Sequence, residues 1–364
     1  MKNRWNQRYS LNNIVILIFI SFFALIFFLN NRKIVPEYFY WDTYTIRNVM
    51  AGLIIGDKNY KSAAIFYKML GFNANSPIYR EQFFSWLVFG LFLILVLYIA
   101  KESSLNLIQI TFLSFFALMF GIYFAYISKD LIVFLFMTLG AYLVAKYRSI
   151  LPLSIVIIVY ATLFRSYWFL VLITFLLLYY AVQKNKSVVS VAIFSLLAIV
   201  IIVFAYNIIN GSQMSVARTA VNDQRLNGQQ ANTMINNLLP NSSVFTDTLN
   251  CLYVFLSLFL PIDGLGSFNE IIYYFWIWGV TVSMLLRWKK IKRNHEWQQY
   301  LYLSSSFCLL LALVVIQSMF EPDIGSVFRH QLAIVPILIL LLFQNSDAVS
   351  NGTDITKTRI NETP

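Results

Sequence analysis

One short stretch of the sequence combines two carboxylates, an arginine and a histidine next to a long apolar run. In EPDIGSVFRH, Glu321 and Asp323 precede Arg329 and His330. Either carboxylate, or His330, has the chemistry of a general base. Arg329 and His330 open the apolar run that follows, where a helix N-terminus would disfavour cations. We expect either an anionic ligand or an internal ion pair with Glu321 or Asp323 to compensate them.

Two further cations lie at the ends of apolar segments. Arg165, in YATLFRSYWFL, sits between two short apolar runs. Its planar guanidinium suits a phosphate or diphosphate, which it can bind through two parallel hydrogen bonds, although it could also extend toward lipid headgroups. Lys129 and Asp130, in YISKDLIVF, mark a helix start. The helix dipole favours Asp130 there, whereas Lys129 needs either solvent or an anion.

Other polar candidates have simpler explanations beside the functional one. Asp42, in YWDTY, is a candidate base or a helix-capping carboxylate. Arg218 and Arg225 are seven residues apart, so they share a face if that stretch is helical. They are either ligand-binding residues or part of a solvated polar loop.

The composition indicates a membrane protein that carries these residues at its surface. Of the 364 residues, 59% are hydrophobic and only 12% are charged, and the mean hydropathy is +0.68. A soluble domain carries roughly 25% charged residues. Apolar runs long enough to cross the hydrocarbon core recur along the chain, without the short alternating strands of a barrel. The sequence predicts an all-α, polytopic integral membrane protein.

The apolar runs and basic clusters predict about ten transmembrane helices with both termini in the cytoplasm. The predicted spans are 11–29, 83–100, 105–126, 131–145, 150–164, 167–182, 187–209, 270–288, 299–319 and 331–344. They form one transmembrane domain, 1–344, followed by a polar cytoplasmic tail, 345–364, which we expect to be disordered.

Two long loops, 31–82 and 210–269, are predicted on the outer face of the membrane. Within the second, 251–264 is too short to cross and contains Pro261 and Gly264, so it is predicted to be re-entrant or interfacial. Lys129, Arg165 and Arg329 also fall on the outer side, against the usual excess of basic residues inside. An anionic ligand on the outer face would offset that cost.

Several function classes are disfavoured by what the sequence lacks. It has no GxxxxGK[ST] phosphate loop, HExxH or GxSxG motif, so an ATP-driven pump or a common hydrolase is not expected. The two cysteines, Cys251 and Cys308, form no CxxC pattern, and no metal site is predicted. The net charge of +11 is partly the cytoplasmic lysine and arginine bias of membrane proteins, and nucleic-acid binding is not expected.

The layout resembles that of the Wzy-type polymerases, which join the repeat units of bacterial O-antigens and capsules. The resemblance covers most of the chain, but few residues carry it. They are YWDTY in the first outer loop, ISKD at 127–130, LFRSY at 163–167, and EPDIGSVFRH before the last span.

The resemblance implies a reaction and its surroundings. An undecaprenyl-diphosphate-linked glycan would be the donor and a lipid-linked repeat unit the acceptor, at the periplasmic face of the inner membrane. No metal, nucleotide sugar or other cofactor would be needed. A flippase and a chain-length regulator of the same pathway would be possible partners, besides the lipid bilayer.

The candidate residues divide into three roles under this hypothesis. Lys129, Arg165 and Arg329 would bind the diphosphate and stabilise its developing charge. The acceptor hydroxyl needs a base, for which the sequence leaves open His330, Glu321, Asp323 and Asp42. Glycan binding is assigned to three residues of the outer loops: Trp41, Arg218 and Arg225.

Two other function classes remain open. Another lipid-linked glycosyltransferase, or an O-antigen-type ligase, would also use outward-facing cations. A flippase or transporter should instead carry charges deep within several spans along its path. The predicted spans are nearly free of such charges, which favours an enzyme.

Overall fold

The computed structural model describes residues 10–100, 103–185, 187–226, 233–240, 242–262, 264–294 and 297–343. The predicted cytoplasmic tail, 345–364, lies outside the described residues. Within them the protein is all-α, as the sequence predicts, and the only strand-like feature is one isolated antiparallel bridge between Met234 and Asp323.

Among the described residues, seven helices are long and apolar enough to cross a membrane. They are α1 (Leu11–Ile34), α4 (Ile78–Ala100), α5 (Leu107–Phe124), α6 (Lys129–Tyr147), α9 (Val188–Asn210), α12 (Phe268–Asn294) and α13 (Trp297–Phe320). An eighth span results if the bent pair α14 (Ile324–Ala333) and α15 (Val335–Leu342) crosses as one unit. The protein is therefore a polytopic helical membrane protein.

The ten-span prediction is supported only as seven or eight candidate spans. The two remaining predicted spans fall on α7 (Leu151–Leu163) and α8 (Trp168–Asn185), whose apolar parts, Leu151–Leu163 and Trp168–Lys184, are shorter than any of the seven candidate spans. Thirteen residues in α7 rise only about 20 Å along a helix axis, against a hydrocarbon core of about 30 Å. These helices would cross only where the chain on either side of them completes the distance.

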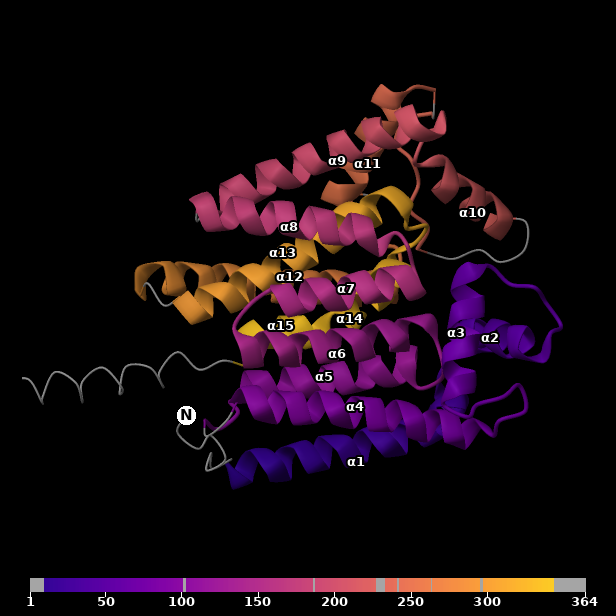
Figure 1. The fold of residues 1–364 in the computed structure, drawn as a ribbon, viewed down its shortest axis with the longest axis vertical. Helices are drawn as coiled ribbons and strands as arrows, with labels where there is room; N and C mark the ends of the chain where they lie inside the picture. Colours follow the sequence, from indigo (N-terminus) through magenta and orange to yellow (C-terminus); the bar gives the residue numbers. More distant parts are fainter. Residues whose placement is uncertain are drawn as a thin grey trace, which may run out of the picture. The chain divides into compact units, whose positions relative to one another are not determined.

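The chain divides into two compact units, Met1–Leu131 with Ile339–Pro364 and Ile132–Leu338. In the first unit, α1 packs against α4 and α5, which run beside it (Figure 1). The predicted loop 31–82 is largely helical there. It contains a short 3₁₀ helix (Glu37–Tyr40) and the paired helices α2 (Trp41–Ala51) and α3 (Lys58–Met69).

In the second unit, α13 is the central helix. In its most apolar 18-residue stretch, 94% of the residues are buried. Helices α8, α9, α11 and α12 all pack against it (Figure 1). A helix that is apolar on all sides and enclosed by others is suited to the middle of a bundle. Its last residue, Phe320, leads directly into the EPDIGSVFRH segment.

The predicted loop 210–269 also contains helices, α10 (Val216–Leu226) and α11 (Val244–Ser257). Helix α11 begins at Val244, where Ser243 and Thr246 form a capping box, and ends at Ser257. The predicted re-entrant segment 251–264 is therefore helical only in its first part. Helix α11 packs against α9 and α13. Whether it enters the membrane stays a prediction.

The last predicted span, 331–344, is not one straight helix. The helix breaks at Ile334, and α14 and α15 meet at 61°. Pro336, the second residue of α15, has no N–H to continue the hydrogen bonding of α14.

The same segment corrects a second expectation. Helix α14 begins at Ile324, with Asp323 as its N-cap, so Arg329 and His330 do not open the helix. His330 lies in the last turn of α14, where the dipole favours a cation. The helix end therefore gives no reason for a compensating anion at these two residues.

Candidate functional site

Three of the sequence-predicted site residues meet in the second unit. Glu321 directly follows α13, His330 lies on α14, and Arg165 lies between α7 and α8. Nδ1 of His330 is 2.5 Å from Oε1 of Glu321, and Nε2 of His330 is 3.2 Å from Nη1 of Arg165. With Ser326, they make up what we call the Glu321 cluster.

The protons of this cluster follow from the chemistry of arginine. A guanidinium stays protonated and can only donate, so Nε2 of His330 must accept from Arg165. The proton of the neutral imidazole is then on Nδ1, which donates to Glu321. His330 is thus held as a neutral imidazole whose Nε2 lone pair accepts from Arg165.

Both oxygens of the Glu321 carboxylate accept hydrogen bonds, one of them from His330. Its second oxygen, Oε2, accepts a 2.5 Å hydrogen bond from the Ser326 hydroxyl. Burial would raise the pKa of Glu321, but His330, Ser326 and Arg329 outweigh it and hold the pKa below the usual value for glutamate. The carboxylate therefore stays ionised and orients the imidazole.

The cluster is partly accessible. The side chains of His330 and Glu321 are 13% and 11% exposed, and Arg165 is 6% exposed. The internal pairing of His330 with Glu321, left open by the sequence, is thus present. Arg329 is half-buried, and its charge acts on Glu321.

Asp323 has a structural role in α14. Its Oδ1 accepts from the backbone N–H of Ser326 at 2.8 Å, so it caps the helix, as aspartate commonly does. The structure thus distinguishes the two carboxylates that the sequence could not rank, because Glu321 contacts His330 and Asp323 holds the helix start.

Lys129 and Asp42 meet in the first unit. Nζ of Lys129 is 3.5 Å from Oδ1 of Asp42 and 3.5 Å from the ring centre of Tyr60. The Tyr60 hydroxyl donates to the same Asp42 oxygen at 2.6 Å. Asp42 lies in the first turn of α2. A diphosphate at Lys129 would have to compete with this carboxylate.

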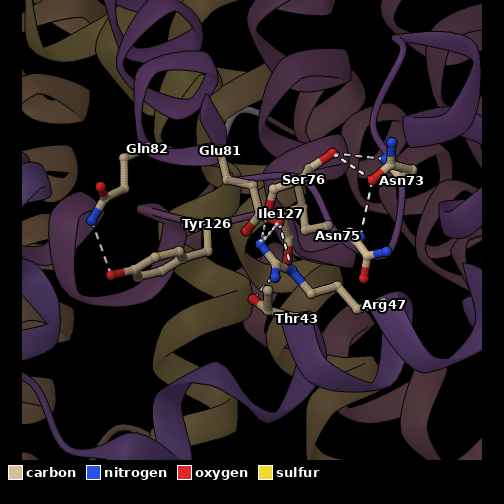
Figure 2. A network of polar contacts seen from close by, with 9 residues as sticks. All are labelled: Thr43, Arg47, Asn73, Asn75, Ser76, Glu81, Gln82, Tyr126 and Ile127. Carbon is tan, nitrogen blue, oxygen red and sulfur yellow. Dashed lines mark hydrogen bonds and ion pairs between the residues drawn. The ribbon is translucent and has the colours of Figure 1, made fainter. Parts of the chain in front are cut away.

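A buried polar network holds the chain that leads to Lys129 (Figure 2). Nε and Nη2 of Arg47 lie 2.8 and 2.6 Å from Oε1 of Glu81, whose residue is fully buried. Arg47 also donates to the Ser76 carbonyl at 2.8 Å. Thr43 donates to the carbonyl of Ile127 at 2.9 Å, which joins α2 to the segment just before Lys129.

The three predicted glycan-binding residues differ in their surroundings. Trp41 is 45% exposed at the start of α2, so it remains available to a ligand. Arg218 is 1% exposed and donates to the Ser318 carbonyl and to Asn237, which excludes the solvated-loop alternative. Arg225 lies on α10, but its side chain is outside the described part of the structure.

No group of three or more His, Cys, Asp or Glu side chains among the described residues is arranged to hold a metal ion. Both cysteines are buried and unpaired with one another. Comparisons with protein families, curated proteins and solved structures found no match.

Sequence reasoning missed the residues that support the candidate site. Ser326 lies five positions after Glu321, in the very segment that stood out, but serine carries no charge that marks it. Arg47 and Glu81 are far apart in sequence, and only the fold pairs them. An acidic residue at the edge of an apolar run was the one available signal for Glu81.

Proposed function

We propose that this protein polymerises lipid-diphosphate-linked oligosaccharide repeat units into a surface polysaccharide, such as an O-antigen or capsule. The observation that carries the proposal is the hydrogen-bonded chain from Glu321 through His330 to Arg165. It places an oriented neutral base next to a cation that matches a diphosphate. The resemblance to Wzy-type polymerases supplies the substrate class.

The reaction needs one proton to move and one anion to leave. Nε2 of His330 takes the proton of the acceptor hydroxyl while its oxygen bonds to the anomeric carbon of the donor sugar. The bond from that carbon to the diphosphate breaks, and the lipid diphosphate departs with the electron pair. Glu321 stabilises the imidazolium that forms, as a carboxylate behind a catalytic histidine does.

Arg165 links donor binding to activation of the base. At rest its Nη1 occupies the lone pair of His330. A diphosphate carries more negative charge than a neutral imidazole and competes for the guanidinium. When Arg165 turns to the diphosphate, Nε2 is released to accept the proton. Arg329, close enough to act on Glu321 electrostatically, adds positive charge on the same side.

The membrane arrangement completes the proposal. With α7 and α8 also crossing, the chain makes ten spans with both termini in the cytoplasm. EPDIGSVFRH and Arg165 then face the periplasm, at the outer surface of the bacterial inner membrane. A flippase would deliver the substrates to this side, and a chain-length regulator would act on the growing polymer.

The test is complementation in a host whose own copy of the gene is deleted, with the surface glycan separated on a gel. The proposal expects a single-repeat band in the deletion and a full ladder with wild-type protein. His330→Gln should fail to restore the ladder at equal expression. The matched control, His295→Gln, changes the only other histidine and should restore it.

Other outcomes identify the competing functions. Long chains that accumulate on the carrier lipid without reaching their final acceptor would indicate a ligase. Single repeats retained on the cytoplasmic side would indicate a flippase. An unchanged ladder in the deletion would contradict all three.

A further inference from the structure

Arg218 is a buried cation whose hydrogen-bond acceptors are neutral, although the carboxylates of Asp247 and Glu321 also act on its charge. It is 1% exposed on α10, and its hydrogen-bond acceptors are the backbone carbonyl of Ser318 and Oδ1 of Asn237. Burying a charge is costly unless it is well compensated. Its position therefore calls for a reason, and a side chain so enclosed cannot reach a glycan.

The Ser318 carbonyl needs a donor from outside its own helix. In an α-helix, the carbonyl of residue 318 would accept from the N–H of residue 322. That residue is Pro322, which has no N–H. Nη2 of Arg218 supplies the missing donor. A cation at this place also suits the negative end of the dipole of α13.

The carbonyl that Arg218 holds is three residues before Glu321. Glu321 itself continues the helical bonding, since its N–H donates to the Gln317 carbonyl at 3.0 Å. The last turn of α13 therefore sets where the Glu321 side chain starts. A shift at Ser318 would move the carboxylate relative to His330.

The residues that follow Glu321 are bonded to the 233–235 segment, which α10 contacts in turn. Ile235 N–H donates to the Pro322 carbonyl at 2.8 Å, and Ile324 N–H donates to the Thr233 carbonyl at 3.0 Å. Asn222 of α10 in turn donates to the Ile235 carbonyl at 3.0 Å. Helix α10 thus contacts both sides of Glu321. Arg218 bonds directly to Ser318 before it, and Asn222 bonds to the 233–237 segment, which holds Pro322 and Ile324 after it.

Helix α10 has its own anchor. Both carboxylate oxygens of Asp247, on α11, accept backbone N–H groups just before α10 begins, from Met214 at 2.7 Å and Ser215 at 3.1 Å. Asp247 is fully buried. Asp247 therefore fixes the start of the helix that carries Arg218, and Ser318 and Asn237 hold its guanidinium.

We propose that Arg218 is a positioning residue: by completing the last turn of α13 at Ser318, it holds the Glu321 carboxylate in line with Nδ1 of His330. The catalytic consequence rests on the proposed function. The geometric claim does not, because the tautomer of His330 reports the contact without any substrate.

The first experiment measures that tautomer. His295→Asn leaves His330 as the only histidine, and Arg165→Met in the same protein removes the donor that keeps Nε2 unprotonated. Nitrogen NMR of this ¹⁵N-histidine-labelled background in lipid nanodiscs, above the titration range of histidine, then reports whether Glu321 alone holds the proton of His330 on Nδ1. Wild-type Arg218 should give the Nδ1–H tautomer. Arg218→Met should convert most of the signal to Nε2–H, because Nδ1 loses its acceptor.

Two further variants make the test independent of folding. Arg218→Lys keeps the charge but has a single ammonium for two acceptors, and it should give an Nε2–H fraction between the other two. Val221→Gln, at an exposed position of the same helix, should match wild type. A folded Arg218→Met protein with the wild-type tautomer overturns the proposal. If that variant does not fold, a wild-type tautomer in Arg218→Lys overturns it.

The glycan gel separates this inference from the proposed function. An altered tautomer with a shortened ladder supports both. An altered tautomer with a full ladder supports the positioning and contradicts the catalytic role of the Glu321 cluster. A wild-type tautomer with a lost ladder contradicts the positioning and indicates that Arg218 acts by another route.

Discussion

Nδ1 of His330 lies 2.5 Å from a carboxylate oxygen of Glu321, although the two residues are nine positions apart and separated by the start of α14. The contact exists because Glu321 directly follows α13 and His330 comes almost two turns into α14. The other ring nitrogen faces Arg165, from a different part of the chain. One imidazole is thus held between an anion and a cation, and the predictions below test each partner.

Glu321→Gln should remove most activity without unfolding the protein. The amide can still accept from Nδ1 of His330, but it carries no negative charge to stabilise the imidazolium that forms, so His330 becomes a weaker base. General-base catalysis typically contributes ~10²–10⁴-fold in rate, and we expect a loss in that range. The measurement is the elongation rate with lipid-linked repeat units extracted from the deletion host.

Asp323 offers the matched comparison. Asp323→Asn keeps an oxygen that caps α14, so it should retain most activity. Asp323→Ala should instead lower the free energy of unfolding by about 0.5–2 kcal/mol through loss of the cap. Equal loss of activity in Asp323→Asn and Glu321→Gln would show that the structure ranks the two carboxylates wrongly.

The sequence predicts the class of fold and singles out three residues that the structure brings together, but it does not predict how they are arranged. Apolar runs reveal membrane helices because the bilayer sets their length and polarity. Charged residues beside such runs stand out because they are costly, which is how Glu321, His330 and Arg165 were found. Their meeting depends on how α7, α8, α13 and α14 pack, and no periodicity in the sequence records that.

The errors have local physical causes. The sequence predicts a helix start at Arg329 and His330 because the long apolar run begins there, whereas the helix in fact begins at Ile324, capped by Asp323. For Arg218 the polar sequence around it predicts a ligand-binding or solvated residue. The structure instead buries it against the Ser318 carbonyl, which has no intrahelical donor because residue 322 is a proline.

The stability of the protein should depend on pH through Glu321. Its pKa in the folded state lies below the usual 4.5, so between these two values the unfolded state binds more protons. The free energy of unfolding therefore rises with pH across that range. The stabilisation by the ionised Glu321 carboxylate is complete above pH 4.5 and is lost as pH falls through the pKa of the folded state. The melting temperatures of wild type and Glu321→Gln, measured in nanodiscs, should differ by an amount that becomes smaller below pH 4.5. A constant difference would contradict the assigned ionisation.

Arg165→Lys should raise the apparent KM for the lipid-diphosphate donor more than it lowers kcat. Lysine offers a point charge in place of the planar fork that binds phosphate oxygens in pairs, so we expect the apparent KM for the lipid-diphosphate donor to rise by about tenfold. Arg165→Ala should raise it further. The measurement is initial rate against donor concentration for each variant. A fall in kcat alone, with KM unchanged, would place Arg165 outside the diphosphate site.

Arg47→Met should destabilise the first unit through the network that leads to Lys129. The substitution leaves the fully buried Glu81 carboxylate without its arginine, and breaking a buried pair in this way typically costs about 3–5 kcal/mol. Replacing both residues, as Arg47→Met with Glu81→Leu, removes the stranded charge and should recover much of that loss. The free energy of unfolding of the two variants, measured in one detergent, decides the point. A double variant no more stable than Arg47→Met would mean that the network acts through its bonds to Ser76 and Ile127, and not through the ion pair itself.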